Sequence, residues 1–87
     1  MKIDTMEEHS MLIFSTRYAM GRMSMAPSIM SDIIKSNLGV INTNTLSVIS
    51  RDIGEADEDN MLGMKDIDVP LWGKLKKVID EELLRRA

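Results

Sequence analysis

The sequence DVPLWGKLKKVIDEELLRR, residues 68–86, carries the clearest helix signal in the chain. Asp68 suits an N-cap, and Pro70 suits the first helical turn, where its missing N–H costs nothing. Apolar residues then recur every three or four positions, with charged residues mainly between them. Arg85 and Arg86 stand in the last turn, where the helix dipole favours positive charge. The stretch therefore predicts an amphipathic helix whose apolar face consists of Leu71, Trp72, Leu75, Val78, Ile79 and Leu83.

A helix is also expected near the start of the chain, over about residues 5–20. Asp4 and Glu7 form a capping box, in which the Asp4 carboxylate serves exposed N–H groups of the first turn. Gly21 either ends this helix or permits a close approach of the backbone. Its expected apolar stripe, at helical spacing, consists of Met11, Leu12, Phe14 and Tyr18.

Two further helices are expected between these. Pro27 suits the first turn of one, and Gly39 favours a left-handed exit from it. Thr43 or Asn44 caps the other, which ends in the acidic sequence GEADEDN, residues 54–60. No part of the sequence shows the alternation of apolar and polar residues, joined by hairpin turns, that is typical of strands. The sequence therefore predicts an all-α fold, a small four-helix domain over residues 1–87.

The composition suits one globular domain with a modest core. The chain has 87 residues, of which 44% are hydrophobic, and a core of this size makes self-association into a homo-oligomer a natural expectation. Nine methionines fill either the core or an adaptable groove for a partner. Cysteine is absent, and no apolar run approaches the roughly 18 residues of a membrane-spanning helix. We expect a cytoplasmic protein with no membrane partner.

Residues 52–68, called the acidic belt below, hold seven acids and only Lys65 as a base. The belt has a formal charge of −6, which leaves +3 on the rest of the chain. Direct DNA binding is not expected, because it needs a broad basic surface. A calcium loop from Asp57 is disfavoured, because its twelfth position is Asp68 rather than glutamate. We instead predict that the belt engages a basic protein partner, with these candidate contact residues: Asp57, Glu58 and Asp59.

No catalytic pattern emerges from the sequence. His9 is the only histidine, and one histidine does not supply an ordinary metal site. It has no recognisable nucleophile beside it, so a surface or half-buried position in the first helix is expected. We predict a protein that is not an enzyme and uses no metal and no cofactor.

The stretch RYAMGRMSMAPS, residues 17–28, is the best candidate for a ligand site. Two guanidinium groups, two hydroxyls and the free N–H groups of a helix N-terminus together suit a phosphate or a carboxylate. The candidate ligand-binding residues are Arg17, Tyr18, Gly21, Arg22, Ser24 and Ser28. In the alternative interpretation, Arg17 or Arg22 forms an ion pair with Asp32 or Asp52, and Gly21 lets two helices cross closely.

The same stretch resembles an Arg-Tyr-Ala-Leu-Gly-Arg-x-Thr-Tyr-like segment of small bacteriophage proteins, in which an apolar helix follows. A later tryptophan after an acidic turn, as in GMKDIDVPLW (residues 63–72), extends the resemblance over most of the chain. Met25 departs from the pattern, which often has an aromatic residue there. The resemblance implies a phage protein that counters host defence in the host cytoplasm. The matching positions are Arg17, Tyr18, Gly21, Arg22 and Ser24.

Two mechanisms of counter-defence follow. In the first, the protein sequesters a phosphorylated nucleotide signal such as a cyclic nucleotide, with Arg17 and Arg22 on the phosphate. Tyr18 then lines the base or sugar, and Ser24 and Ser28 add hydrogen-bond donors. In the alternative, the acidic belt masks a basic nucleic-acid-binding surface of a host defence protein, as an anti-CRISPR inhibitor does.

Overall fold

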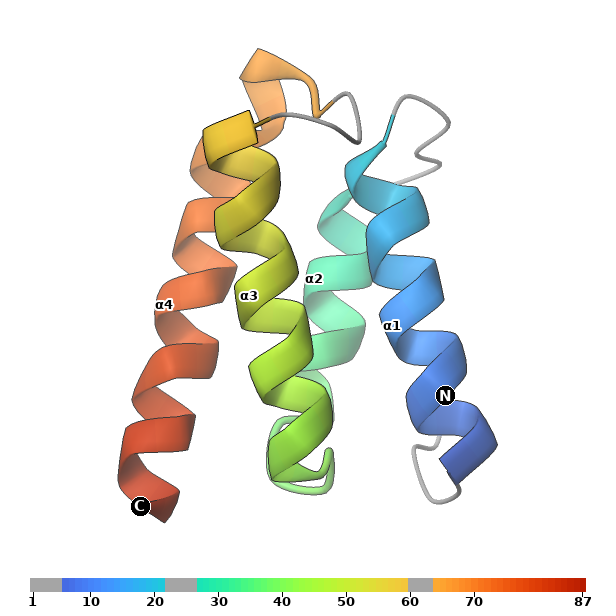
Figure 1. Ribbon diagram of the computed structural model, residues 1–87, viewed down its shortest axis with the longest axis vertical. Coiled ribbons are helices and arrows are strands. Elements are labelled where there is room, and N and C mark those ends of the chain that lie inside the picture. Colours follow the sequence, from blue (N-terminus) through green and yellow to red (C-terminus); the bar gives the residue numbers. More distant parts are fainter. Residues whose placement is uncertain (1–5, 22–26, 60–63) are drawn as a thin grey trace.

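The computed structural model describes residues 6–21, 27–59 and 64–87, without the side chains of residues 57–59. Within these ranges the chain forms four α-helices, one short 3₁₀ helix and no strand (Figure 1). The all-α, four-helix prediction is therefore confirmed for the residues that the structure describes. The elements are α1 (Met6–Met20), α2 (Pro27–Ser36), α3 (Thr43–Asp59), η1 (Asp66–Asp68) and α4 (Val69–Arg86).

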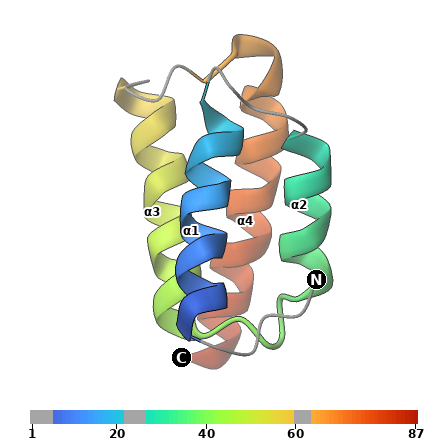
Figure 2. The ribbon, with the colours of Figure 1, turned by 90° about the vertical axis from the view of Figure 1, so that its right-hand side faces the viewer.

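The four helices run up and down alternately along one long axis, so that α1 and α3 point one way and α2 and α4 the other (Figure 1). In the view turned by 90°, α1 lies in front of α4, with α3 and α2 on either side (Figure 2). Both α1 and α4 pack against α2 and α3, and the contact of α3 with α4 is the most extensive. This arrangement is an up-and-down four-helix bundle.

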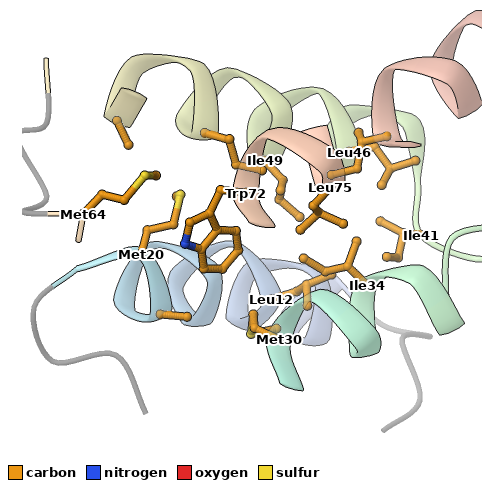
Figure 3. Close-up of a cluster of buried hydrophobic side chains, with 14 residues drawn as sticks. Leu12, Met20, Met30, Ile34, Ile41, Leu46, Ile49, Met64, Trp72 and Leu75 are labelled. Atoms are coloured by element: carbon orange, nitrogen blue, oxygen red, sulfur yellow. The ribbon is translucent and has the colours of Figure 1, made fainter. Parts of the chain in front are cut away.

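One apolar core fills the space between the helices (Figure 3). Trp72 of α4 lies near Met20 of α1 and Ile49 of α3, and its side chain is almost fully buried. Met64 precedes η1 in a stretch expected to be an irregular connection, and it too is buried in the core. The residues of the core are Leu12, Ala19, Met20, Met30, Ile34, Ile41, Leu46, Ile49, Ile53, Ala56, Met64, Trp72, Leu75 and Ile79.

The predicted buried stripe of α1 is wrong in all but one position. Leu12 is buried, but Met11, Phe14 and Tyr18 expose 59%, 67% and 57% of their surface. At about 100° per residue, these three lie about 100° to 160° around the helix from Leu12. The buried side includes Thr16, whose hydroxyl donates a hydrogen bond of 2.7 Å to the Leu12 carbonyl and is thereby satisfied in the core. Helix α1 therefore has two sides with large apolar residues, and the bundle covers one of them.

The start of α4 also differs from the prediction. Asp68 occupies the N-cap position and Pro70 follows in the first turn, but the Asp68 side chain makes no capping hydrogen bond. The reason is that η1 runs directly into α4. Asp68 consequently has helical backbone angles, with φ −91° and ψ −11°, in place of the extended conformation of an N-cap.

Candidate functional site

Arg17, the first cation of the predicted ligand site, lies on α1 and faces Asp52 of α3. Its Nε donates a hydrogen bond of 2.6 Å to one carboxylate oxygen, and a terminal nitrogen donates one of 3.3 Å to the other. Asp52 is buried, with 7% of its side chain exposed, whereas Arg17 is 38% exposed. The hydrogen bond with Asp52 raises the pKa of Arg17 above its ordinary value. The alternative interpretation of Arg17 as one half of an ion pair with Asp52 is thus confirmed.

The other candidates do not gather around that guanidinium in the part of the chain that the structure describes. Tyr18 is exposed about 100° further around α1. Gly21 donates its N–H to the carbonyls of Arg17 and Tyr18 and ends α1. Ser28 is exposed in the first turn of α2. Arg22 and Ser24 lie outside the described residues, as do the side chains of 57–59, so ligand or partner binding there stays a prediction.

Loss of the Arg17 guanidinium should destabilise the fold, because the buried carboxylate of Asp52 then lacks this cation. We expect Arg17→Ala to lower the free energy of unfolding by about 1–2 kcal/mol, because it leaves a buried carboxylate unpaired while the lost pair was partly open to water. Urea titration of each variant measures this. Arg51→Ala is the matched control, since Arg51 is exposed on α3 next to Asp52. Equal stability of Arg17→Ala and the native protein would show that the pair contributes nothing.

A groove between α1 and α2 is a surface hollow lined almost entirely by apolar side chains. Its volume is about 460 Å³, and its lining contains no charged residue. The hydroxyls of Ser15 and Tyr18 are its only polar side-chain groups. We call this the α1–α2 groove; its lining consists of Phe14, Ser15, Tyr18, Ala19, Ile29, Met30 and Ile33.

Sequence reasoning missed this groove, although the signal was present. The apolar residues of α1 spread around much of its circumference, which is more than one buried stripe needs. Ile29 of α2 is apolar as well, and it is 60% exposed and lines the groove. Only the packing of α1 on α2 shows that these surplus apolar residues meet on one face.

A second hollow, of about 450 Å³, lies between α3 and α4. Arg51, Glu55 and Lys76 line it together with Trp72 and two glycines. Lys76 is already engaged, because its Nζ donates a hydrogen bond of 2.8 Å to Asp80. The hollow carries charges of both signs, and the ammonium group of Lys76 already pairs with Asp80, so the hollow is poorly suited to bind an anion. It therefore does not replace the predicted phosphate site.

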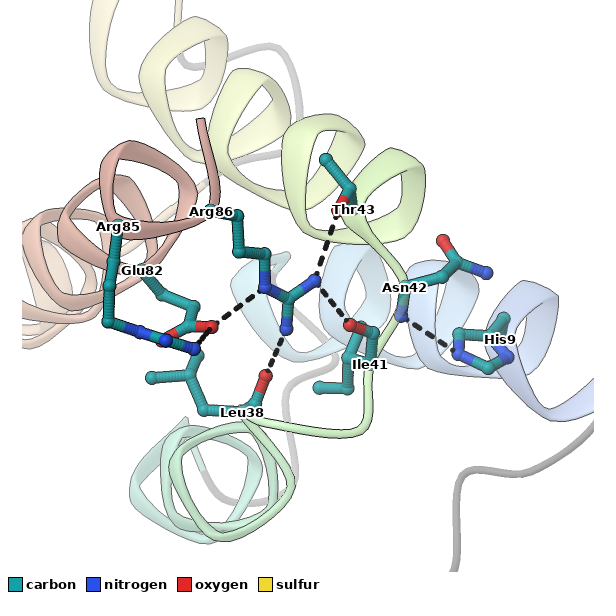
Figure 4. Close-up of polar contacts among 8 residues, drawn as sticks. All are labelled: His9, Leu38, Ile41, Asn42, Thr43, Glu82, Arg85 and Arg86. Atoms are coloured by element: carbon teal, nitrogen blue, oxygen red, sulfur yellow. Dashed lines mark hydrogen bonds and ion pairs between the residues drawn. The ribbon is translucent and has the colours of Figure 1, made fainter.

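A polar cluster at the other end of the bundle holds the connection from α2 to α3 (Figure 4). Arg86, in the last turn of α4, donates hydrogen bonds to the backbone carbonyls of Leu38 and Ile41, at 2.7 and 2.8 Å. It also donates to Glu82 at 2.7 Å and to the Thr43 hydroxyl at 3.2 Å. Arg86 therefore satisfies two backbone carbonyls of the connection that follows α2, a structural role.

His9 takes part in the same connection from the side of α1. Its Nε2 accepts a hydrogen bond of 3.1 Å from the backbone N–H of Asn42 (Figure 4). The side chain is buried, so the expected surface or half-buried position is wrong. The reason lies in the fold, because the residues after α2 pass over the first turns of α1 and enclose the ring. Because this ring nitrogen accepts a hydrogen bond from the backbone of the α2–α3 connection, His9 has a structural role.

Low pH should lower the free energy of unfolding, because it protonates Glu82. Hydrogen bonds from Arg85 and Arg86 lower the pKa of Glu82 from 4.5 to about 2. Because the folded value lies below the unfolded one, the stabilisation is present above about pH 4.5 and is lost as the pH falls from there towards 2. Glu82→Gln should therefore flatten the decline of unfolding free energy over this range, measured by urea titration at each pH. Glu81→Gln, at an exposed neighbour, should leave the decline as steep as in the native protein; a steep decline in both variants would contradict the assignment.

Neither membrane insertion nor a metal centre is indicated by the described residues. No helix among them is both long enough and apolar enough to cross a bilayer. The same residues contain no group of three or more histidine, cysteine, aspartate or glutamate side chains placed to hold a metal ion.

Comparison with known proteins adds no further constraint. No protein-family model, no curated protein and no solved structure matches the chain. The geometry of its own residues is therefore the basis for a functional proposal.

Proposed function

We propose that this is a binding protein without catalytic activity, which holds an amphipathic helix of a partner protein in the α1–α2 groove. The observation that carries the proposal is the exposure of Met11, Phe14, Tyr18 and Ile29 beside an uncharged hollow of about 460 Å³. Large exposed apolar patches mark interaction sites, because a free monomer gains nothing from leaving them in water. A groove between two antiparallel helices fits the apolar side of a third helix.

The groove supports a protein partner better than a phosphorylated nucleotide. A phosphate needs cations or several donors, but the lining offers two hydroxyl groups and no charge. Arg17 lies outside the lining, and its guanidinium already engages Asp52. Of the two mechanisms that the sequence suggests, contact with a protein is the one that this surface favours. In the phage setting that the resemblance implies, such contact would mask a host defence protein.

A labelled peptide tests the proposal directly. The probe is a designed amphipathic helix of about 18 residues with leucine at every third or fourth position, and its scrambled sequence is the control. Fluorescence anisotropy should show binding of the helix only. Ile29→Asp should weaken it at least tenfold, whereas Ile67→Asp, at an exposed apolar residue of η1, should not. Absence of binding, or equal losses in both variants, would overturn the proposal.

The same preparation tests the nucleotide mechanism. A cyclic nucleotide at 100 times its dissociation constant adds about 2.7 kcal/mol of stability to the folded state. If cyclic nucleotides raise the melting temperature of the native protein but not of Arg17→Ala, signal sequestration replaces the groove as the preferred function.

A further inference from the structure

Helix α1 carries a seam of exposed residues with the spacing of a coiled coil. Met11, Phe14 and Tyr18 follow one another at intervals of three and four, and Glu7 and Gly21 continue the same alternation at either end. Such a 3–4 spacing keeps one edge of a helix facing a second helix along its length. The bundle leaves this edge open, because it buries the opposite side of α1. A seam with this spacing fits another helix that has the same spacing.

We propose that, when no partner protein is bound, α1 of a second copy of this chain occupies this edge, packed antiparallel across a two-fold axis near Phe14. This inference rests on the proposed function of the α1–α2 groove as a helix-binding surface. In an isologous contact the same patch must complement itself, and a symmetric seam centred on Phe14 does so. Met11 of each copy then lies opposite Tyr18 of the other.

The charges of α1 select the antiparallel direction. Its first turn holds Glu7 and Glu8, and its last turn holds Arg17. A parallel pair would bring the acidic first turns together, which costs free energy. An antiparallel pair instead places each Glu7 beside the end of the partner α1 and the adjacent start of α2. The first turn of α2 contains no acid of its own, and its positive dipole end favours a carboxylate.

The area of the patch places the contact at the weak end of specific interfaces. The exposed parts of Met11, Phe14, Tyr18 and Ile29 amount to roughly 500 Å² per copy, at about 200 Å² for each fully exposed side chain. Two copies together bury about 1,000 Å², which is at the low end of specific interfaces. The expected dimer is therefore reversible, with a dissociation constant in the micromolar range. A partner helix that binds more tightly displaces the second copy.

Sedimentation measures the association. Velocity runs from about 1 to 300 µM should show a monomer converting to a dimer, because this range brackets a micromolar constant. Phe14→Glu should raise the dissociation constant at least 30-fold. Ile67→Glu is the matched control, since it also places a glutamate at an exposed apolar position but lies in η1; it should leave the constant unchanged. A dimer that survives Phe14→Glu overturns the inference.

Cross-linking tests the direction, because the chain has no cysteine of its own. A short bis-maleimide should join two copies of Ser15→Cys, which lies near the proposed axis. It should not join two copies of Glu7→Cys, whose positions are about 20 Å apart along an antiparallel pair at 1.5 Å per residue. Efficient cross-linking of Glu7→Cys overturns the antiparallel arrangement.

The outcomes also separate this inference from the proposed function. A chain that stays monomeric at 300 µM (about the top of the range above) but still binds the leucine-faced peptide at the groove overturns the dimer alone. A chain that stays monomeric and does not bind the peptide overturns both.

Discussion

Trp72→Ala is expected to lower the free energy of unfolding by about 4 kcal/mol, because it removes a large buried aromatic ring and leaves a cavity that the backbone fills only in part. The ring is 1% exposed and lies among residues from α1, α3 and α4. For a domain of this size the loss is comparable to the total stability, which is about 5–10 kcal/mol. The variant should therefore be partly unfolded at 37 °C.

Urea titration at 10 °C, followed by circular dichroism, measures the loss while the variant is still folded. Leu84→Ala is the control, since Leu84 lies on the same helix but is exposed, and its removal should change stability by less than about 0.5 kcal/mol. A cost below about 2 kcal/mol for Trp72→Ala would contradict a core centred on this ring, given the usual range for such substitutions.

Arg86→Ala is the second large effect, with an expected loss of about 3 kcal/mol. The substitution leaves the carbonyls of Leu38 and Ile41 without their charged donor, and each such bond contributes about 1.5 kcal/mol or more. The loss should appear both in the urea midpoint and in faster hydrogen exchange of the connection between α2 and α3.

Arg85→Ala provides a sharp control because Arg85 pairs with the same carboxylate. Both arginines donate to Glu82, but Arg85 is 70% exposed and donates no hydrogen bond to the α2–α3 connection, whereas Arg86 is 19% exposed. Arg85→Ala should therefore lower the urea midpoint less than Arg86→Ala does, because it removes only an exposed part of the Glu82 pairing. Similar losses in the two variants would mean that the ion pair with Glu82 matters and that the bonds to the connection do not.

The sequence by itself determined the four helices and where they begin, but Gly39 does not adopt the left-handed conformation expected at the exit of α2, and that helix ends at Ser36. Proline, glycine and capping residues stop or start a helix through local geometry, and the 3.6-residue period identifies the element between them. Pro27, Thr43 and Val69 consequently begin helices at or beside the predicted positions. The apolar positions of α4 could also be identified from the sequence, because this helix has one apolar side that faces the core.

Tertiary structure decided which side of α1 is buried and which groups pair across the bundle. Apolar residues surround much of α1, so periodicity alone does not distinguish the covered side from the side that forms the α1–α2 groove. Residue spacing also does not predict contacts between residues that are far apart in the sequence. Arg86 meets Leu38 across 48 residues and His9 meets Asn42 across 33, because the bundle brings helix ends together. Local sequence sets the energy of each helix, whereas the pairing of faces depends on the packing of all four at once.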